Sequence, residues 1–105
     1  MSVLLVLTNL PDRGAAEALA RTLVERRVAA CVNVLSPCRS TYRWEGKLQV
    51  DEEHPVLIKT TRERYPALEA AVREVHPYDL PELIAVPVES GLPAYLDWVR
   101  AETAA

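Results

Sequence analysis

The densest group of chemically capable side chains lies in residues 76–82, where His76, Tyr78, Asp79 and Glu82 stand close together. An imidazole beside carboxylates can bind a ligand, or it can act as a general base that a carboxylate orients. A single histidine at a helix end can equally be a cap or a partner of the helix dipole. Both interpretations of His76, ligand binding and capping, follow from the residues.

Two prolines are predicted to hold this stretch in place. Pro77 disfavours helical backbone for His76, so we expect a helix to end there. Pro81 cannot donate a backbone hydrogen bond and fits best just before a strand. The apolar residues 83–88 follow, and we expect a strand that is covered on both faces. The candidate site therefore lies in a stiff segment between a helix end and a buried strand.

Lys59 is a second candidate, because it interrupts the apolar segment 56–60. A lysine in such a strand has to pair, extend its charged end to water or face a cavity. It can pair with a carboxylate such as Glu82, or it can bind an anion. The sequence leaves both roles open.

The acidic run 51–54 can bind a hard cation through its carboxylate oxygens, or it can form a solvated hairpin arm. Cys31 lies in an apolar strand, where a cysteine is expected to be packed and inert. Cys38 lies near a bend and is expected to be more exposed. The two cysteines lack a CxxC spacing, so we expect free thiols. The aromatic residues that we expect to anchor the core and interfaces are Tyr42, Trp44 and Trp98.

The apolar pattern predicts the element order β-α-β-β-α-β, followed by a terminal helix. Asp12 is the predicted cap of the first helix, and Glu45 and Gly46 form a predicted hairpin turn. The predicted strands are 3–8, 29–44 with a bend or bulge at Pro37, 47–61 and 83–88, and the predicted helices are 12–27, Pro66 to His76 and a short one from Pro93.

This order predicts a ferredoxin-like α+β sandwich, an antiparallel sheet with two helices on one face. The length of 105 residues predicts one domain, residues 1–105. Strands 3–8, 56–60 and 83–88 are apolar on both faces, whereas two helices can cover only one face. The long hairpin also leaves exposed strand edges. We therefore expect copies of the chain to associate with closed cyclic symmetry, and the spacing leaves dimer and trimer open.

Charge and hydropathy argue against two classes of partner. The formal net charge is -3, and no basic stripe is present, so nucleic acid is not an expected partner. No apolar run reaches the ~18 residues of a membrane helix, so a membrane is not expected either. The first residues carry no basic leader or cleavage site, which makes the cytoplasm the expected compartment.

Five short blocks of sequence carry a resemblance to a known family, at residues 28–33, 42–47, 57–61, 76–83 and 95–98. Together they resemble the CutA family of divalent-cation tolerance proteins. The resemblance implies a compact homotrimer of ferredoxin-like subunits, similar in assembly to the PII signalling proteins. It also implies a cytoplasmic role in tolerance of copper and other divalent metals, with no accepted catalytic activity.

The resemblance also bears on metal binding. His76-Pro77-Tyr78 matches the family's HPY motif. In some members, metal binding is attributed to a Cys that ends the first strand and to two adjacent His residues at the motif. Thr8 and Val75 occupy two of those positions here, so only His76 remains. The predicted metal ligands are therefore His76 and Glu82, with copper or another divalent cation as the only expected cofactor.

Three functional hypotheses follow. The first is a trimeric metal-tolerance protein, acting as a weak metal binder or as a PII-like signalling protein. The second is a sensor that binds a small anion. In both hypotheses the ligand would occupy a cleft between subunits. The third, which ranks last, is a hydrolytic enzyme with His76 as base and Glu82 orienting it. The predicted partners are copies of the chain and a divalent metal. The residues predicted to line the cleft are Trp44, Lys59, His76, Tyr78 and Glu82.

Overall fold

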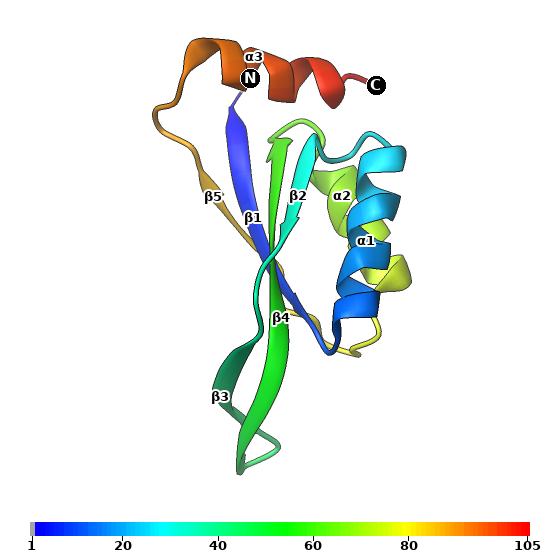
Figure 1. Cartoon of the computed structure of the whole chain (residues 1–105), viewed down its shortest axis with the longest axis vertical. Helices are drawn as coiled ribbons and strands as arrows, with labels where there is room; N and C mark the ends of the chain where they lie inside the picture. Colours follow the sequence, from blue (N-terminus) through cyan, green and yellow to red (C-terminus); the bar gives the residue numbers. More distant parts are fainter. Residues whose placement is uncertain (1) are drawn as a thin grey trace.

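A five-stranded antiparallel sheet forms the body of the chain (Figure 1). The structure is a computed structural model and describes residues 2–105. Strands run in the order β2-β4-β1-β5, and β3 pairs with the first half of β4. This arrangement confirms the predicted α+β architecture. The elements are β1 Val3–Leu10, α1 Arg13–Glu25, β2 Cys31–Val34, β3 Cys38–Trp44, β4 Lys47–Thr61, α2 Tyr65–Val75, β5 Ile84–Pro87 and α3 Pro93–Glu102.

Helices α1 and α2 pack against one face of the sheet (Figure 1). Their apolar residues recur at helical spacing and form one stripe on each helix. Leu23 of α1 and Leu68 of α2 meet Val6 of β1 in the main core, and all three are almost fully buried. Asp12 caps α1 as predicted, because its carboxylate accepts a backbone N–H of the first turn at 2.8 Å. The helix layer is therefore explained by local sequence pattern.

The other face of the sheet, which we call the open face, carries a row of apolar side chains opposite the helices. The strand register places Leu5 between Lys59 and Val86 on this face. Val86 is 46% exposed, and Ile84 beside it is 53% exposed. The two long helices thus cover one face only, as expected. The apolar members of the open face are Leu5, Leu7, Leu57, Ile84 and Val86.

Helix α3 crosses one end of the sheet (Figure 1). Its Val99 packs with Val3 and Ala30 in a second, smaller core. Arg27 fixes the end of this helix, because its guanidinium donates to two carbonyls there at 3.1 and 3.3 Å. Arg27 itself has a left-handed backbone, with φ of 59°. The terminal helix is therefore anchored both by apolar packing and by a cap from another segment.

Strand β3 and the first half of β4 form a hairpin that extends away from the body (Figure 1). The chain is elongated as a result, with extents of 44 × 25 × 23 Å. The bend expected at Pro37 is present, since it separates β2 from β3. The predicted turn is also confirmed, because Glu45 and Gly46 both have positive φ, 50° and 79°. Two successive positive φ values match the twist that a two-residue hairpin needs.

The prediction that residues 83–88 form a strand covered on both faces is wrong for the single chain. Strand β5 lies at the edge of the sheet, and all four of its residues are exposed. Its apolar composition predicted cover on both faces, because strands buried on both faces are usually apolar throughout. An edge strand of this composition instead has to be covered by something outside the single chain.

Candidate functional site

His76 ends helix α2 and ties it to the end of β1. Its backbone N–H donates to the carbonyl of Val72 at 2.8 Å. In the side chain, Nε2 lies 2.7 Å from the carbonyl oxygen of Asn9, and Nδ1 accepts the backbone N–H of Tyr78 at 3.2 Å. A carbonyl only accepts and a backbone N–H only donates. The proton of the neutral ring is therefore on Nε2, and the lone pair is on Nδ1.

This geometry gives His76 a structural task. Both ring nitrogens have partners within the chain, and burial lowers the pKa of the imidazole, opposed by the Asn9 carbonyl and by Glu53. The ring also lies against Tyr78, with centroids 4.9 Å apart. A metal ion could take the Nδ1 lone pair only after the hydrogen bond from Tyr78 opens. The metal role of His76 stays a prediction.

Glu82, the other predicted metal ligand, is connected to His76 through hydrogen bonds to Asn9. The side-chain amide of Asn9 donates to the carboxylate of Glu82 at 3.0 Å, while the backbone carbonyl of the same residue bonds His76. Asn9 therefore links both candidate ligands, which sequence reasoning missed. Neither ring nitrogen of His76 bonds to Glu82, so the pair predicted for a hydrolytic enzyme is not formed.

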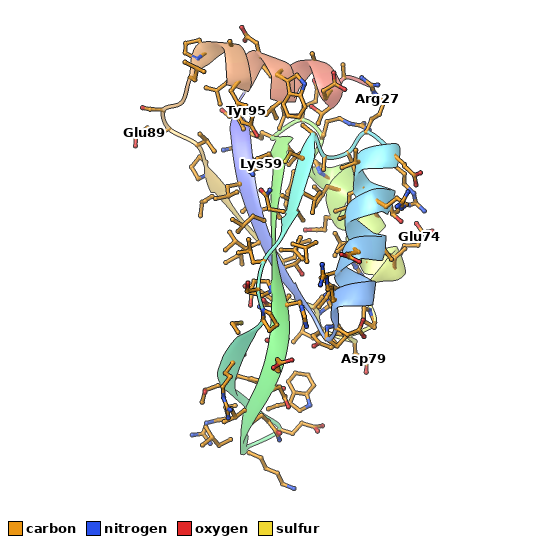
Figure 2. The ribbon with its side chains drawn as sticks, in the orientation of Figure 1. Arg27, Lys59, Glu74, Asp79, Glu89 and Tyr95 are labelled. Atoms are coloured by element: carbon orange, nitrogen blue, oxygen red, sulfur yellow. The ribbon has the colours of Figure 1, made fainter. Side chains whose placement is uncertain are left out.

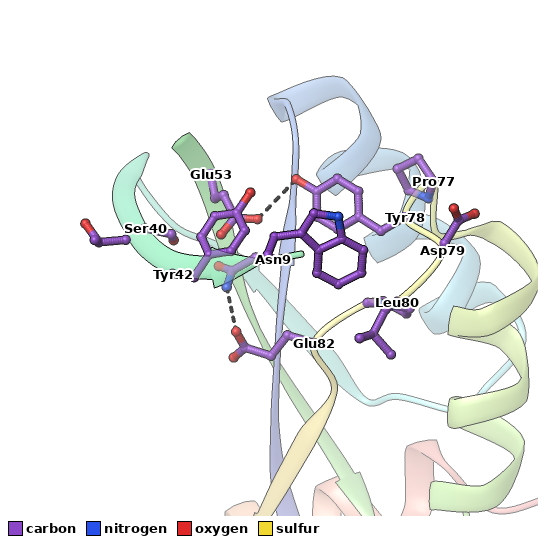
Figure 3. A pocket seen from close by; sticks show the side chains of 12 residues that line it. Asn9, Ser40, Tyr42, Glu53, Pro77, Tyr78, Asp79, Leu80 and Glu82 are labelled. Carbon is purple, nitrogen blue, oxygen red and sulfur yellow. Dashed lines mark hydrogen bonds between the residues drawn. The ribbon is translucent and has the colours of Figure 1, made fainter. Parts of the chain in front are cut away.

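A pocket lies between the hairpin and residues 77–82 (Figure 3). Its volume is about 880 Å³, within the usual range of ligand pockets. Tyr78 and Glu82 line it, as predicted for the cleft, and so does Trp44. Its lining residues are Asn9, Ser40, Thr41, Tyr42, Trp44, Glu53, Pro77, Tyr78, Asp79, Leu80, Pro81 and Glu82.

The ionisable lining of this pocket is acidic. Three carboxylates line it, from Glu53, Asp79 and Glu82, and neither Lys nor Arg occurs in the lining. The hydroxyl of Tyr78 donates to Glu53 at 3.1 Å. Burial, reinforced by Glu53, raises the pKa of Tyr78 to about 12. The phenol therefore stays neutral at physiological pH and continues to donate its hydrogen bond. Because the charge of the lining comes from the three carboxylates, the pocket favours a cation over an anion.

Lys59 lies away from this pocket, on the open face. In Figure 2 it lies in the part of the sheet nearest α3, whereas Asp79 marks the pocket loop at the opposite end of the helices. The ammonium of Lys59 donates to the side-chain oxygen of Asn33 on the neighbouring strand. The pair predicted between Lys59 and Glu82 does not form within the chain, where Lys59 donates to Asn33 and Glu82 accepts from Asn9. A shared cleft with Lys59 would need a second copy.

The remaining metal candidates do not converge. Among residues 2–105 no cluster of three His, Cys, Asp or Glu side chains is close enough to hold a metal ion. The acidic run 51–54 lies in β4, the predicted hairpin arm, where successive side chains point to opposite faces. Cys31 and Cys38 are both free thiols, and Cys38 is exposed as expected. Thr8, at the position of the family's cysteine, is only 1% exposed.

Sequence reasoning missed three contributors to the pocket as a site. Asn9, Tyr42 and Glu53 come from β1, β3 and β4, and the fold alone brings them together. Tyr42 was predicted only as an anchor, and Glu53 only as part of the acidic run. No spacing in the sequence relates these residues to 76–82, so only the topology of the sheet could reveal them.

The antiparallel sheet, the two helices on one face and the long hairpin place the chain in the class of ferredoxin-like α+β proteins with an extended arm. Within that class, the sequence matches the CutA1 divalent ion tolerance protein family over residues 4–102. The chain belongs to this family, which confirms the resemblance that the sequence blocks carry. The family is named for tolerance of divalent ions and not for a reaction.

Individual relatives agree with this assignment. The divalent-cation tolerance protein CutA of Thermus thermophilus is 43% identical over 98 residues, which cover 93% of this chain and 95% of the relative. Protein CutA of Mus musculus is 45% identical over 102 residues, and the match spans only 58% of that longer protein. The crystal structure of CutA from Xylella fastidiosa superposes with a TM-score of 0.96 at 43% identity, covering 99% of this chain and all of that one.

Proposed function

We propose that the chain supports tolerance of divalent cations, copper among them, as a homotrimer in the cytoplasm. The observation that carries the proposal is the match to a family named for divalent-ion tolerance along residues 4–102. The two free thiols, Cys31 and Cys38, suit a reducing compartment. No helix among residues 2–105 is long and apolar enough to cross a membrane.

The open face supports self-association. It presents Ile84 and Val86 at 53% and 46% exposure on an edge strand, next to the apolar centre of β1. Contiguous exposed apolar surface of this kind marks an interaction site, and closed cyclic symmetry is the usual outcome. The trimer is the state that the family resemblance implies. Light scattering should give three times 11.7 kDa, and a stable monomer at micromolar concentration would contradict the proposal.

A matched pair of variants tests whether this face is the contact. Ile84→Glu places a charge on the open face, whereas Val24→Glu places the same charge on α1, on the opposite side of the sheet. Both positions are exposed in the single chain, at 53% and 43%. We expect Ile84→Glu to yield folded monomers and Val24→Glu to assemble like the wild type. Unchanged assembly of both variants would exclude the open face.

We also propose that divalent cations bind weakly at His76 and Glu82, where Nδ1 of His76 becomes available when the Tyr78 hydrogen bond opens. His76→Gln tests this without removing the link to β1, because a Gln side chain can still donate to the Asn9 carbonyl. Glu82→Gln likewise keeps an acceptor for Asn9. Calorimetric titration with Cu²⁺ should show weaker binding in both variants. Equal binding in all three proteins would remove these ligands from the proposal.

Tolerance itself is tested in cells. A bacterial strain that lacks its own member of the family should grow better at elevated copper when it expresses this chain. The assembly-deficient Ile84→Glu variant, expressed at equal abundance, should give less protection. Growth equal to that of the empty vector, with the wild-type chain abundant and assembled, would reject the tolerance role.

A further inference from the structure

Three partly exposed aromatic rings surround the acidic pocket. Tyr42, Trp44 and Tyr78 line it and are 41%, 44% and 36% exposed in the single chain. Two of them come from β3 in the hairpin and one from the loop after α2, so segments far apart in the sequence meet here. Large aromatic side chains that remain accessible on several sides of one hollow are typical of a binding site for a ligand with an apolar surface.

The carboxylates that line the pocket favour a ligand with positive charge. Glu53 and Glu82 lie with Tyr42 on one side of the pocket, while Asp79 stands on the other side and points away from them (Figure 3). Within residues 2–105 two of these carboxylates accept from neutral donors: Glu53 from the Tyr78 hydroxyl and Glu82 from the Asn9 amide. The pocket therefore holds negative charge that no lysine or arginine in its lining balances.

Hydrogen bonding also prepares the rings. The Tyr78 hydroxyl donates to Glu53 at 3.1 Å, and the Tyr42 hydroxyl donates to Asp51. Donation to a carboxylate shifts electron density from the O–H bond into the ring, which makes the ring face more negative. A negative ring face attracts a cation placed over it. Both tyrosines are thus held in position and made better partners for a cation by the same contacts.

We propose that this pocket binds an organic cation that carries an alkylated ammonium group. The methyl groups of such a cation pack on aromatic faces, and its diffuse charge needs no tight cluster of oxygens. A hard metal ion needs six or more oxygen ligands at short range, whereas the carboxylates here are spread around about 880 Å³. This inference does not rest on the metal-tolerance proposal.

Choline and its neutral isostere 3,3-dimethylbutan-1-ol form the test pair, because they differ only in the charge of the central atom. The assembled wild-type protein is titrated by calorimetry in phosphate buffer with EDTA, free of amine buffers and metal ions. We expect choline to bind and the neutral isostere to bind at least about tenfold more weakly. Equal binding of the two, or no binding of choline, would overturn the proposal.

Matched variants locate the site. Trp44→Ala removes a ring of the pocket, and Trp98→Ala removes an equally exposed indole on α3, 42% against 44%. Glu53→Gln removes charge but can still accept from Tyr78, and Glu89→Gln is its exposed control. We expect Trp44→Ala and Glu53→Gln each to weaken choline binding about tenfold, with both controls unchanged. Loss in the controls alone would place binding elsewhere and reject the pocket.

A spectroscopic readout guards against misfolded variants. The chain has 2 tryptophans, so Trp98→Phe leaves Trp44 as the single indole emitter. Choline should change the emission of Trp44 with the same midpoint as calorimetry. Trp44→Phe in the wild-type background keeps a smaller aromatic face and should bind between the wild type and Trp44→Ala. Binding without any change in Trp44 emission would contradict contact with this ring.

Discussion

The hydrogen bonds of His76 predict a specific stability defect and a specific pH dependence. The ring is 8% exposed and joins the end of α2 to the Asn9 carbonyl at 2.7 Å. His76→Ala leaves that carbonyl without its partner and removes the packing against Tyr78. An unsatisfied buried polar group costs about 1–3 kcal/mol, so we expect a loss of about 2 kcal/mol of unfolding free energy for the Ala variant. His76→Gln retains a donor and should lose about half as much.

The pH dependence follows from the direction of the pKa shift. Burial lowers the pKa of His76 below the 6.5 of a free histidine side chain, so the unfolded chain binds a proton more readily than the folded chain does. The stabilisation from neutral His76 is then complete above pH 6.5 and is lost as the pH falls below it. The stability difference between the wild type and His76→Gln should therefore narrow from pH 7.5 to pH 5.5, two pH values roughly one unit on either side.

Urea unfolding followed by circular dichroism at both pH values measures this difference, at one fixed chain concentration because association adds to apparent stability. Every other titrating group is common to the two proteins and cancels in the comparison. A difference that stays constant or widens in acid would refute the reasoning. It would mean that the folded state accepts the proton at His76, with Glu53 dominating over burial.

Three smaller predictions concern single contacts. Thr8→Val should raise the unfolding free energy by about 1 kcal/mol, because the buried Thr8 hydroxyl has no hydrogen-bond partner among the described residues; a loss would reveal a partner. Glu45→Asn should stabilise the hairpin by about 0.5 kcal/mol, since Asn tolerates the left-handed φ of 50° better, and thermal melting would detect the opposite sign. Arg27→Lys should speed amide hydrogen exchange in α3 by up to about tenfold, because an ammonium cannot reach both carbonyls at the end of the helix. An unchanged exchange rate would show that Arg27 does not stabilise this helix end.

The elements that sequence predicted well are those with a local cause. Asp12 caps α1 through a neighbour three residues away, and the positive φ values of Glu45 and Gly46 belong to one turn. The stripe of apolar residues on α1 needs only helical periodicity to be recognised. Each of these features depends on residues within a few positions of one another, which is the range over which a single sequence carries a strong signal.

The features that sequence did not predict depend on which strands become neighbours. The apolar residues 84–87 look the same in a central strand and in an edge strand, and only the sheet order places β5 at the edge. The pocket joins Asn9, Tyr42 and Glu53 to the loop after α2, across 73 residues in the case of Asn9 and Glu82. Sequence also could not show that His76 bonds the carbonyl of Asn9 on β1, because the two residues become neighbours only in the folded sheet.

Asn9 also shows why a ligand in the pocket and the stability of the fold need not compete. Its carbonyl holds His76 at 2.7 Å, while its side-chain amide holds Glu82 at 3.0 Å. A cation that draws Glu82 toward the pocket breaks only the amide contact, which is exposed and worth little. The carbonyl contact, which fixes the end of α2, stays in place. The loop that carries the candidate ligands can therefore adjust to a bound cation without releasing the helix that positions it.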